Sequence, residues 1–192
     1  MKVIAINGSA RKDGNCAILL RHAFQPLQSA GIKTDMMQLA GEKIRGCTAC
    51  YQCWQRKDGR CAIRDDIVND CIEQLQLSQG VLLASPTYFA DITAEMKALI
   101  DRAGMVARAN GHMLRRKVGA GVVAVRRGGA MHAFHSINGF FLISQMVVPG
   151  STYWNMGIGR EIGDVERDRE GLETMSVLGE NMAWLLHQIH KQ

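Results

Sequence analysis

Hydrophobic and polar residues follow two alternating patterns along this chain. Short apolar runs predict strands, and longer segments in which apolar residues recur at helical spacing predict helices. The predicted strands are 2–6, 33–39, 80–85, 117–125 and 145–148, and the predicted helices are 15–30, 65–77, 93–109, 130–144 and 169–190. Because strands and helices alternate, the pattern predicts a right-handed, doubly wound parallel α/β sheet. We see no linker and no internal repeat, so we expect one domain over residues 1–192.

Composition narrows the class of protein. The chain has 192 residues, of which 47% are hydrophobic and 21% charged, and its formal net charge is +5. That apolar content is typical of a globular protein and excludes a disordered chain. The basic residues are scattered and no aromatic residues interleave with them. We therefore expect no nucleic-acid partner.

Neither secretion nor membrane insertion is predicted. The N-terminal apolar run ends at Asn7 after four residues, which is too short for a signal peptide. Residues 128–159 carry no formal charge, but their densest apolar part, 139–148, is about half of the ~20 residues that a membrane span needs. We expect a buried helix and strand or a subunit interface there. The protein should be cytoplasmic, with reduced thiols.

The loop after the first predicted strand suits a phosphate group. Residues 7–16 are polar or small and lead into a helix, whose free N–H groups and positive dipole end favour an anion. Ser9 and Asn15 add hydrogen-bond donors, and Arg11 adds a guanidinium group that can form charge-assisted hydrogen bonds to a phosphate. The P-loop pattern and the dinucleotide pattern G-x-G-x-x-G are both absent, so a mononucleotide fits best. An ordinary strand-to-helix turn is the alternative.

Two more loops should lie at the same edge of the sheet, where doubly wound folds bind ligands. In residues 85–93, Pro86 fixes the turn, and Tyr88 and Phe89 offer aromatic surface to a ligand. The segment Arg126-Arg127-Gly128-Gly129 lets backbone approach a ligand closely, with arginine charge nearby. The alternatives are aromatic packing for the first loop and surface solvation for the arginines.

Four of the six cysteines form the pattern C-x2-C-x2-C-x7-C in an expected irregular loop insertion at 47–61. The candidate metal ligands are Cys47, Cys50, Cys53 and Cys61. Thiolates two residues apart converge as an iron–sulfur cluster requires, whereas structural zinc more often uses two separated C-x2-C pairs. The spacing therefore favours [4Fe–4S], with zinc or a metal-free loop of reduced cysteines as alternatives.

Four other polar residues have simpler interpretations. The position of Cys16 at a helix N-terminus predicts a lowered thiol pKa and a place beside the phosphate rather than a nucleophile. Cys71 is expected to be buried in its helix. Asp65 and Asp66 are expected to cap the helix that they precede. Since no Ser/His/Asp arrangement emerges, we assign no catalytic side chain.

Several motifs occur together in a familiar order. They are Gly8-Ser-Ala-Arg11 with Gly14-Asn15, the compact cysteine run, Ser85-Pro-Thr-Tyr88, and Met96-Lys-Ala-Leu-Ile-Asp101-Arg102. Together they resemble the NAD(P)H-dependent FMN reductase branch of the flavodoxin-like fold, and within it the chain is most similar to the iron–sulfur flavoproteins. The similarity covers essentially the whole chain.

The resemblance implies a three-layer, five-stranded sheet that binds FMN non-covalently. It implies that Ser9, Arg11, Gly14, Asn15 and Cys16 hold the phosphate, that Pro86, Thr87, Tyr88 and Phe89 flank the isoalloxazine, and that Arg126, Arg127, Gly128 and Gly129 lie at its pyrimidine side. It also implies a [4Fe–4S] cluster on the cysteine loop, near the flavin and often close to a neighbouring subunit of a homodimer or homotetramer. This sequence departs from the family by its long, basic fourth spacing and by Cys16 where many relatives have Thr.

The expected activity follows from the flavin. FMN would take a hydride from NAD(P)H, or electrons from a ferredoxin-type donor, and would pass electrons to a quinone or another small-molecule acceptor. The main alternative is a non-enzymatic electron carrier of the flavodoxin or iron–sulfur type. A zinc-bound redox sensor is a third possibility.

Overall fold

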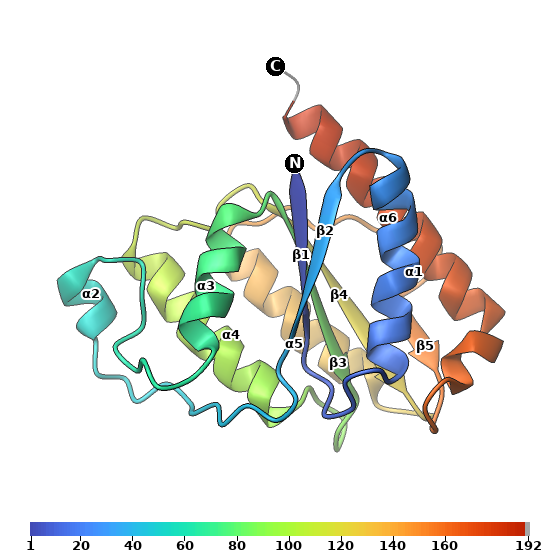
Figure 1. Ribbon diagram of the computed structural model, residues 1–192, viewed down its shortest axis with the longest axis horizontal. Coiled ribbons are helices and arrows are strands. Elements are labelled where there is room, and N and C mark those ends of the chain that lie inside the picture. The colour runs from blue at the N-terminus through green and yellow to red at the C-terminus, as the bar shows by residue number, and fades with distance from the viewer. Residues whose placement is uncertain (191–192) are drawn as a thin grey trace.

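The computed structural model describes residues 1–190 and contains a sheet of five parallel strands in the order β2-β1-β3-β4-β5 (Figure 1). The strands are β1 (Lys2–Asn7), β2 (Lys33–Gln38), β3 (Gly80–Pro86), β4 (Val118–Val125) and β5 (Met156–Ile158). This is the flavodoxin-like strand order, with β1 and β3 at the point where the order reverses. The predicted fold class is confirmed. The predicted domain runs on to residues 191 and 192, which lie outside the described part.

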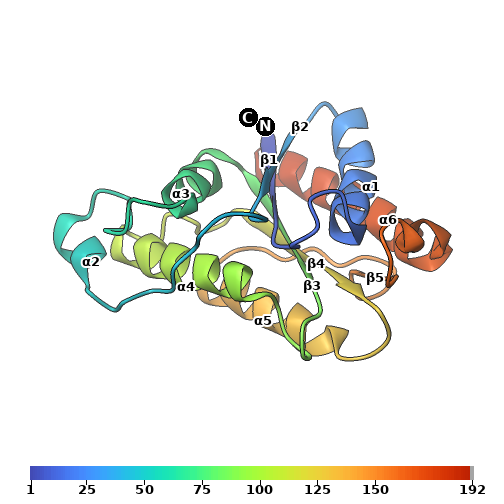
Figure 2. The ribbon, with the colours of Figure 1, turned by 60° about the horizontal axis from the view of Figure 1, so that its bottom comes forward.

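Helices cover both faces of the sheet, as Figure 2 shows. One face carries α1 (Asn15–Ser29) and α6 (Arg169–Ile189), and the other carries α3 (Val68–Leu77), α4 (Ala94–Ala109) and α5 (Ala130–Ile143). The short helix α2 (Gln52–Arg56) lies beside α4, and a 3-10 helix, η1 (Asp164–Arg167), follows β5. Thus the cysteine segment, expected to be irregular, contains one short helix.

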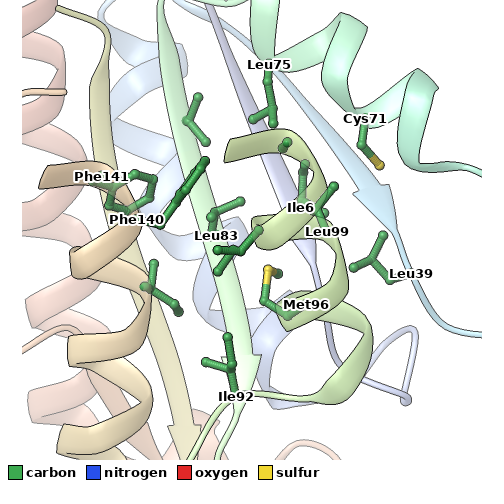
Figure 3. Close-up of a cluster of buried hydrophobic side chains, with 14 of the residues drawn as sticks. Ile6, Leu39, Cys71, Leu75, Leu83, Ile92, Met96, Leu99, Phe140 and Phe141 are labelled. Atoms are coloured by element: carbon green, nitrogen blue, oxygen red, sulfur yellow. The ribbon is translucent and has the colours of Figure 1, made fainter. Parts of the chain in front are cut away.

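Successive residues of the central strands face opposite layers. In β1, Val3 and Ala5 pack against α1 and α6, whereas Ile4 and Ile6 join the cluster under α3, α4 and α5. Figure 3 shows this second cluster, in which Met96 and Leu99 of α4 lie over the sheet. The period of two in side-chain direction explains why these strands are continuous apolar runs: both faces are covered. Burial of each such Leu or Ile side chain stabilises the fold by about 1.5–3 kcal/mol.

The last strand is not where the sequence pattern predicts it. Of the predicted strand 145–148, only Val147 makes a single parallel bridge, to Val118, and β5 lies instead at Met156–Ile158. The apolar run at 145–148 has another cause, because Met146 is buried in the core under α5. β5 has three residues and pairs with the end of β4. A strand so short leaves no periodic pattern for sequence analysis to detect.

The parallel strands bring their carboxyl ends to one edge of the sheet, at the bottom of Figure 1. The loops after β1, β3, β4 and β5 therefore meet there. Within residues 1–190, none of the helices combines the length and the hydropathy needed to span a membrane.

Candidate functional site

A hollow of about 150 Å³ opens among the loops at the carboxyl edge of the sheet. Its lining residues come from the ends of four strands and from the first turn of α1. They are Ser9, Arg11, Asn15, Cys16, Pro86, Thr87, Tyr88, Ala124, Arg126, Gly159 and Arg160. We call it the strand-end hollow.

Most of the residues predicted to bind FMN line this hollow. Those that do not are Gly14, Phe89, Arg127, Gly128 and Gly129. Sequence analysis missed Ala124, Gly159 and Arg160. The last two follow β5, and because the sequence pattern predicts the last strand at 145–148, it does not place the loop after β5 at the ligand edge. The pair Gly159-Arg160 repeats the small-plus-basic composition of the other loops and was the available signal.

The electrostatics of the strand-end hollow favour an anion. Arg11, Arg126 and Arg160 contribute guanidinium groups, and none of the lining side chains within residues 1–190 is acidic. Helix α1 begins here without a side-chain cap and without an acidic residue in its first turn, as far as the described chain shows. Its first N–H groups and positive dipole end are thus available to a ligand. The Ser9 hydroxyl accepts a hydrogen bond from the Arg11 N–H (3.1 Å) and keeps its own proton for donation.

Asn15 has a structural role that the sequence did not reveal. Its Nδ2 donates to the carbonyl of Glu161 (3.0 Å), and its Oδ1 accepts from the N–H of Gly163 (3.0 Å). Arg11 adds a hydrogen bond from Nη1 to the carbonyl of Arg160 (2.9 Å). The first turn of α1 is therefore clamped to the loop after β5. Asn15 still lines the hollow, and its role as a phosphate donor stays a prediction.

The predicted low pKa of Cys16 is wrong. Burial raises the pKa of its thiol to about 12, although backbone hydrogen bonds at Ala124 and at Cys16 itself act in the opposite direction. The helix N-terminus favours the thiolate, but desolvation outweighs this effect when the side chain is 1% exposed. Cys16 is a neutral wall of the hollow at physiological pH.

The loop after β3 forms a strained turn at the mouth of the hollow. Tyr88 and Asp91 exchange two backbone hydrogen bonds (2.8 and 3.0 Å), and both Phe89 and Ala90 have positive φ angles. Phe89 is fully exposed at the tip, so it does not pack against this chain. Gly129, with φ of 87°, lies against Ala90, where a Cβ would come within 3.1 Å of the Ala90 Cα. That glycine contributes to the packing of the two loops, and its contact with a ligand stays a prediction. Strain of this kind is common at binding sites.

Thr87 has a buried hydroxyl oxygen with no hydrogen-bond partner in the described chain. The residue lines the strand-end hollow, and its backbone N–H is already bonded to the carbonyl of Ala124 (2.9 Å). Buried polar atoms rarely stay unpaired in proteins. The Thr87 hydroxyl is therefore a candidate ligand contact.

The four candidate metal ligands line a second hollow, the cysteine hollow. Cys47, Cys50, Cys53 and Cys61 surround it, and Met105 and Val106 of α4 form its apolar floor. The segment with α2 that carries these cysteines lies beside α3 and α4, on the opposite side of the molecule from β5 (Figures 1 and 2). The two hollows share no lining residue among residues 1–190.

The backbone around these cysteines is strained. Ala49, Tyr51 and Lys57 all have positive φ angles, which non-glycine residues rarely adopt. A hydrogen bond from the backbone of Gln52 lowers the pKa of the exposed Cys50 thiol, whereas burial raises the pKa of the Cys53 thiol. In residues 1–190, no three His, Cys, Asp or Glu side chains are grouped so as to hold a single metal ion.

Helix α3 begins at Val68, after the N-cap residue Ile67. The prediction that a carboxylate caps this helix holds for Asp66, whose Oδ1 accepts a hydrogen bond from the Val68 N–H (3.2 Å). Asp66 forms an ion pair with Arg102 of α4 in which the side chains are 1% and 0% exposed. Asp65 pairs with Arg45 at the surface. Burial acts to raise the pKa of Asp66, but hydrogen bonds, first from Arg102, outweigh it and hold that pKa below its ordinary value. Cys71 is buried in α3, as predicted.

Comparison with known proteins identifies the family. A sequence model of the family described as NADPH-dependent FMN reductase matches residues 1–161. The chain belongs to this family. It is 36% identical to an iron–sulfur flavoprotein of Methanocaldococcus jannaschii, with 100% of both chains covered. It is 32% identical to an iron–sulfur flavoprotein of Methanosarcina thermophila, with 100% of this chain and 98% of the other covered.

A solved structure supports the fold at lower sequence similarity. RosB, bound to 8-demethyl-8-formylriboflavin-5'-phosphate, aligns with a TM-score of 0.80 at 17% identity, over 100% of this chain and 81% of that one. Membership of the FMN reductase family supports a flavin oxidoreductase, as the sequence predicted.

Proposed function

We propose that this member of the FMN reductase family binds FMN in the strand-end hollow and transfers electrons from NAD(P)H to a quinone or another small acceptor. The observation that carries the proposal is the composition of that hollow. An uncapped helix N-terminus and three arginines lie beside an aromatic loop. The helix N-terminus and the arginines suit a phosphate, and the aromatic loop suits a planar ring.

The residues present fit FMN. The Ser9 hydroxyl, the first N–H groups of α1 and the Arg11 guanidinium would hold the phosphate. The unpaired hydroxyl of Thr87 would gain a partner, and Tyr88 would border the ring system. FMN supplies the hydride and electron chemistry when it is bound.

The chain contributes binding and electrostatics to this chemistry. Arg126 and Arg160 would stabilise negative charge on a reduced ligand, because cations lower the energy of an anion more strongly where water is excluded. The neutral Cys16 thiol leaves this positive field undiminished. The clamp between Asn15 and residues 161–163 keeps the loop that carries Arg160 in place. We propose no acid or base residue.

We further propose that the cysteine hollow holds a [4Fe–4S] cluster and accepts electrons from a ferredoxin-type donor. Four thiols line one hollow without converging on a single point, within the described residues. A cluster takes one thiolate at each iron, whereas zinc needs all its ligands around one ion. The names of the relatives, iron–sulfur flavoproteins, agree with this choice.

The prediction of a homodimer or homotetramer remains a proposal. The uncharged stretch 128–159 leaves several large apolar side chains exposed. They are Leu142, Ile143, Val147, Tyr153, Trp154 and Ile158. Large apolar side chains that are exposed in a monomer mark an interaction site when they form one patch. Light scattering on the purified protein would test the proposal, and a monomer at all concentrations would contradict it.

One purification tests the main proposals. Protein purified anaerobically should show flavin absorption, iron without zinc, and bleaching of the flavin on NADPH addition. An absent flavin, and failure to take up added FMN, would refute FMN binding. A flavin that NADPH does not bleach but reduced ferredoxin does would favour the electron carrier. Zinc in place of iron would favour the redox sensor.

A further inference from the structure

Arg102 is a charged residue on an otherwise apolar part of helix α4. Leu99, Ala103 and Val106 around it are buried in the core, and the Arg102 side chain is 0% exposed. A buried guanidinium is costly, and apolar residues of similar volume often serve stability equally well. The hydrogen bonds of this arginine show what it does there.

Within residues 1–190, the hydrogen bonds of the Arg102 guanidinium all reach the segment 45–66, which contains the four clustered cysteines. The terminal nitrogens Nη1 and Nη2 bind the two carboxylate oxygens of Asp66, and they also donate to the carbonyls of Arg45 and Ile63 (3.1 Å each). The remaining nitrogen, Nε, donates to the Sγ of Cys61 at 3.3 Å. The contacts with Arg45, Ile63 and Asp66 hold the segment on α4. The bond to sulfur gives the buried Nε–H its acceptor and also places the guanidinium in direct contact with one of the four cysteines.

The arrangement also orients charge. The Asp66 carboxylate lies at the Nη end of the guanidinium, whereas the Cys61 sulfur lies at the Nε side. The pair is neutral as a whole, but its positive member is the one in contact with the thiol. Such a dipole, held in a buried place, stabilises extra negative charge on the sulfur. Hydrogen bonds to ligand sulfurs and nearby charge are two of the factors that set the potential of an iron–sulfur cluster.

We propose that Arg102 is a positioning residue that raises the reduction potential of a cluster bound by the four cysteines, and that Asp66 limits this increase. The inference rests on the proposed cluster site. The reduced cluster carries one more negative charge than the oxidised one, so a cationic N–H donor at Cys61 favours the reduced form. Removing the donor's charge should lower the potential, and removing the opposing carboxylate should raise it.

The test compares anaerobically reconstituted wild type with Arg102→Gln and Asp66→Asn. Asn is isosteric with Asp and keeps an acceptor for the Arg102 fork. Arg108→Gln is the matched control, because it removes the same charge from an exposed position on the same helix. Redox titration followed by electron paramagnetic resonance gives the cluster potential separately from the flavin. At the wild-type midpoint, the reduced fraction should fall in Arg102→Gln, rise in Asp66→Asn and stay unchanged in Arg108→Gln.

Shifts of the cluster potential in opposite directions in Arg102→Gln and Asp66→Asn would support the proposal, because a general loosening of the cysteine segment would not produce them. Unchanged potentials at normal iron content, or shifts of the same sign in both variants, would overturn it and leave the cluster site standing. If Arg102→Gln does not fold, the direction of the potential shift in Asp66→Asn decides. A lower or unchanged cluster potential in that variant overturns the proposal. A wild-type protein that takes up no iron would refute the cluster site, and the inference with it.

Discussion

Asn15 provides a sharp test of where a phosphate binds, because stability and FMN affinity should rank its Ala and Asp variants in opposite orders. Asn15→Ala removes the hydrogen bonds to Glu161 and Gly163, each of which contributes about 0.5–1.5 kcal/mol. The free energy of unfolding should therefore fall by about 1–3 kcal/mol. Asn15→Asp keeps the acceptor for the Gly163 N–H and places a carboxylate in the first turn of α1, where the helix dipole favours it by about 0.3–1 kcal/mol. The stability order should be wild type, Asp, Ala.

Affinity for FMN should follow a different order. A carboxylate about 5 Å from a phosphate is repelled by about 3 kcal/mol per unit charge at an effective dielectric constant of ~20. That energy corresponds to binding weaker by about 100-fold. Asn15→Ala lacks this repulsion and loses only the clamp on the loop after β5. The affinity order should therefore be wild type, Ala, Asp.

Two measurements on each variant check whether the Ala and Asp variants exchange places between the stability order and the affinity order. Urea unfolding of the apoprotein gives the stability order, and quenching of flavin fluorescence on titration gives the affinity order. Riboflavin, which lacks the phosphate, is the control ligand: the gap between the Ala and Asp variants should disappear with it. Equal FMN affinity for both variants, or a gap that persists with riboflavin, would refute a phosphate at the start of α1.

Three other outcomes follow from the burial or close packing of single residues. Iodoacetamide at about pH 8 should modify Cys47 in the metal-free protein and leave Cys16 intact, because Cys47 is exposed, whereas Cys16 is buried and its pKa is about 12. Equal modification of the two cysteines, measured by mass spectrometry, would contradict this prediction. The pKa of Asp66 is lower in the folded protein than its unfolded value of about 3.9, so its stabilisation is present above that pH and is lost as the pH falls through the folded pKa. Measured by urea unfolding, the free energy of unfolding should therefore fall more steeply with decreasing pH in wild type than in Asp66→Asn. Parallel plots of this free energy against pH would contradict the prediction. Gly159→Ala places a Cβ at 2.8 Å from both the Asn15 Nδ2 and the Val165 N, which should destabilise the apoprotein by about 1–3 kcal/mol; undiminished urea stability would show that the loop simply shifts.

The two sites are built differently, and this affects how each can be tested. The strand-end hollow is formed by loops that the sheet holds together, so single substitutions in it should leave the fold intact. The cysteine hollow lies on a segment that is fastened to α4 through Arg102 and Asp66. Breaking one member of a buried pair costs about 3–5 kcal/mol, which is why the isosteric Asn is the informative variant at position 66.

Local patterns in the sequence determined the sheet and most of its ligand edge. Strands β1, β3 and β4 are visible because each carries a run of apolar residues covered on both faces. The loops that follow these three strands carry most of the candidate ligand residues in short continuous stretches. Most of the predicted flavin contacts line one hollow for that reason. The cysteine pattern was equally local, and its four cysteines do line one hollow.

Tertiary structure decided the properties that depend on distant residues. The three-residue strand β5 exists only through its pairing with β4, so Gly159 and Arg160 could not be assigned to the site beforehand. The thiol of Cys16 is neutral because packing removes water from it, an effect that no helix-terminus rule contains. Arg102 and Asp66 are 36 positions apart, and their pairing is set by how α4 packs against the cysteine segment. Short-range order along the chain specifies which elements form, whereas burial and charge pairing depend on which surfaces those elements bring together.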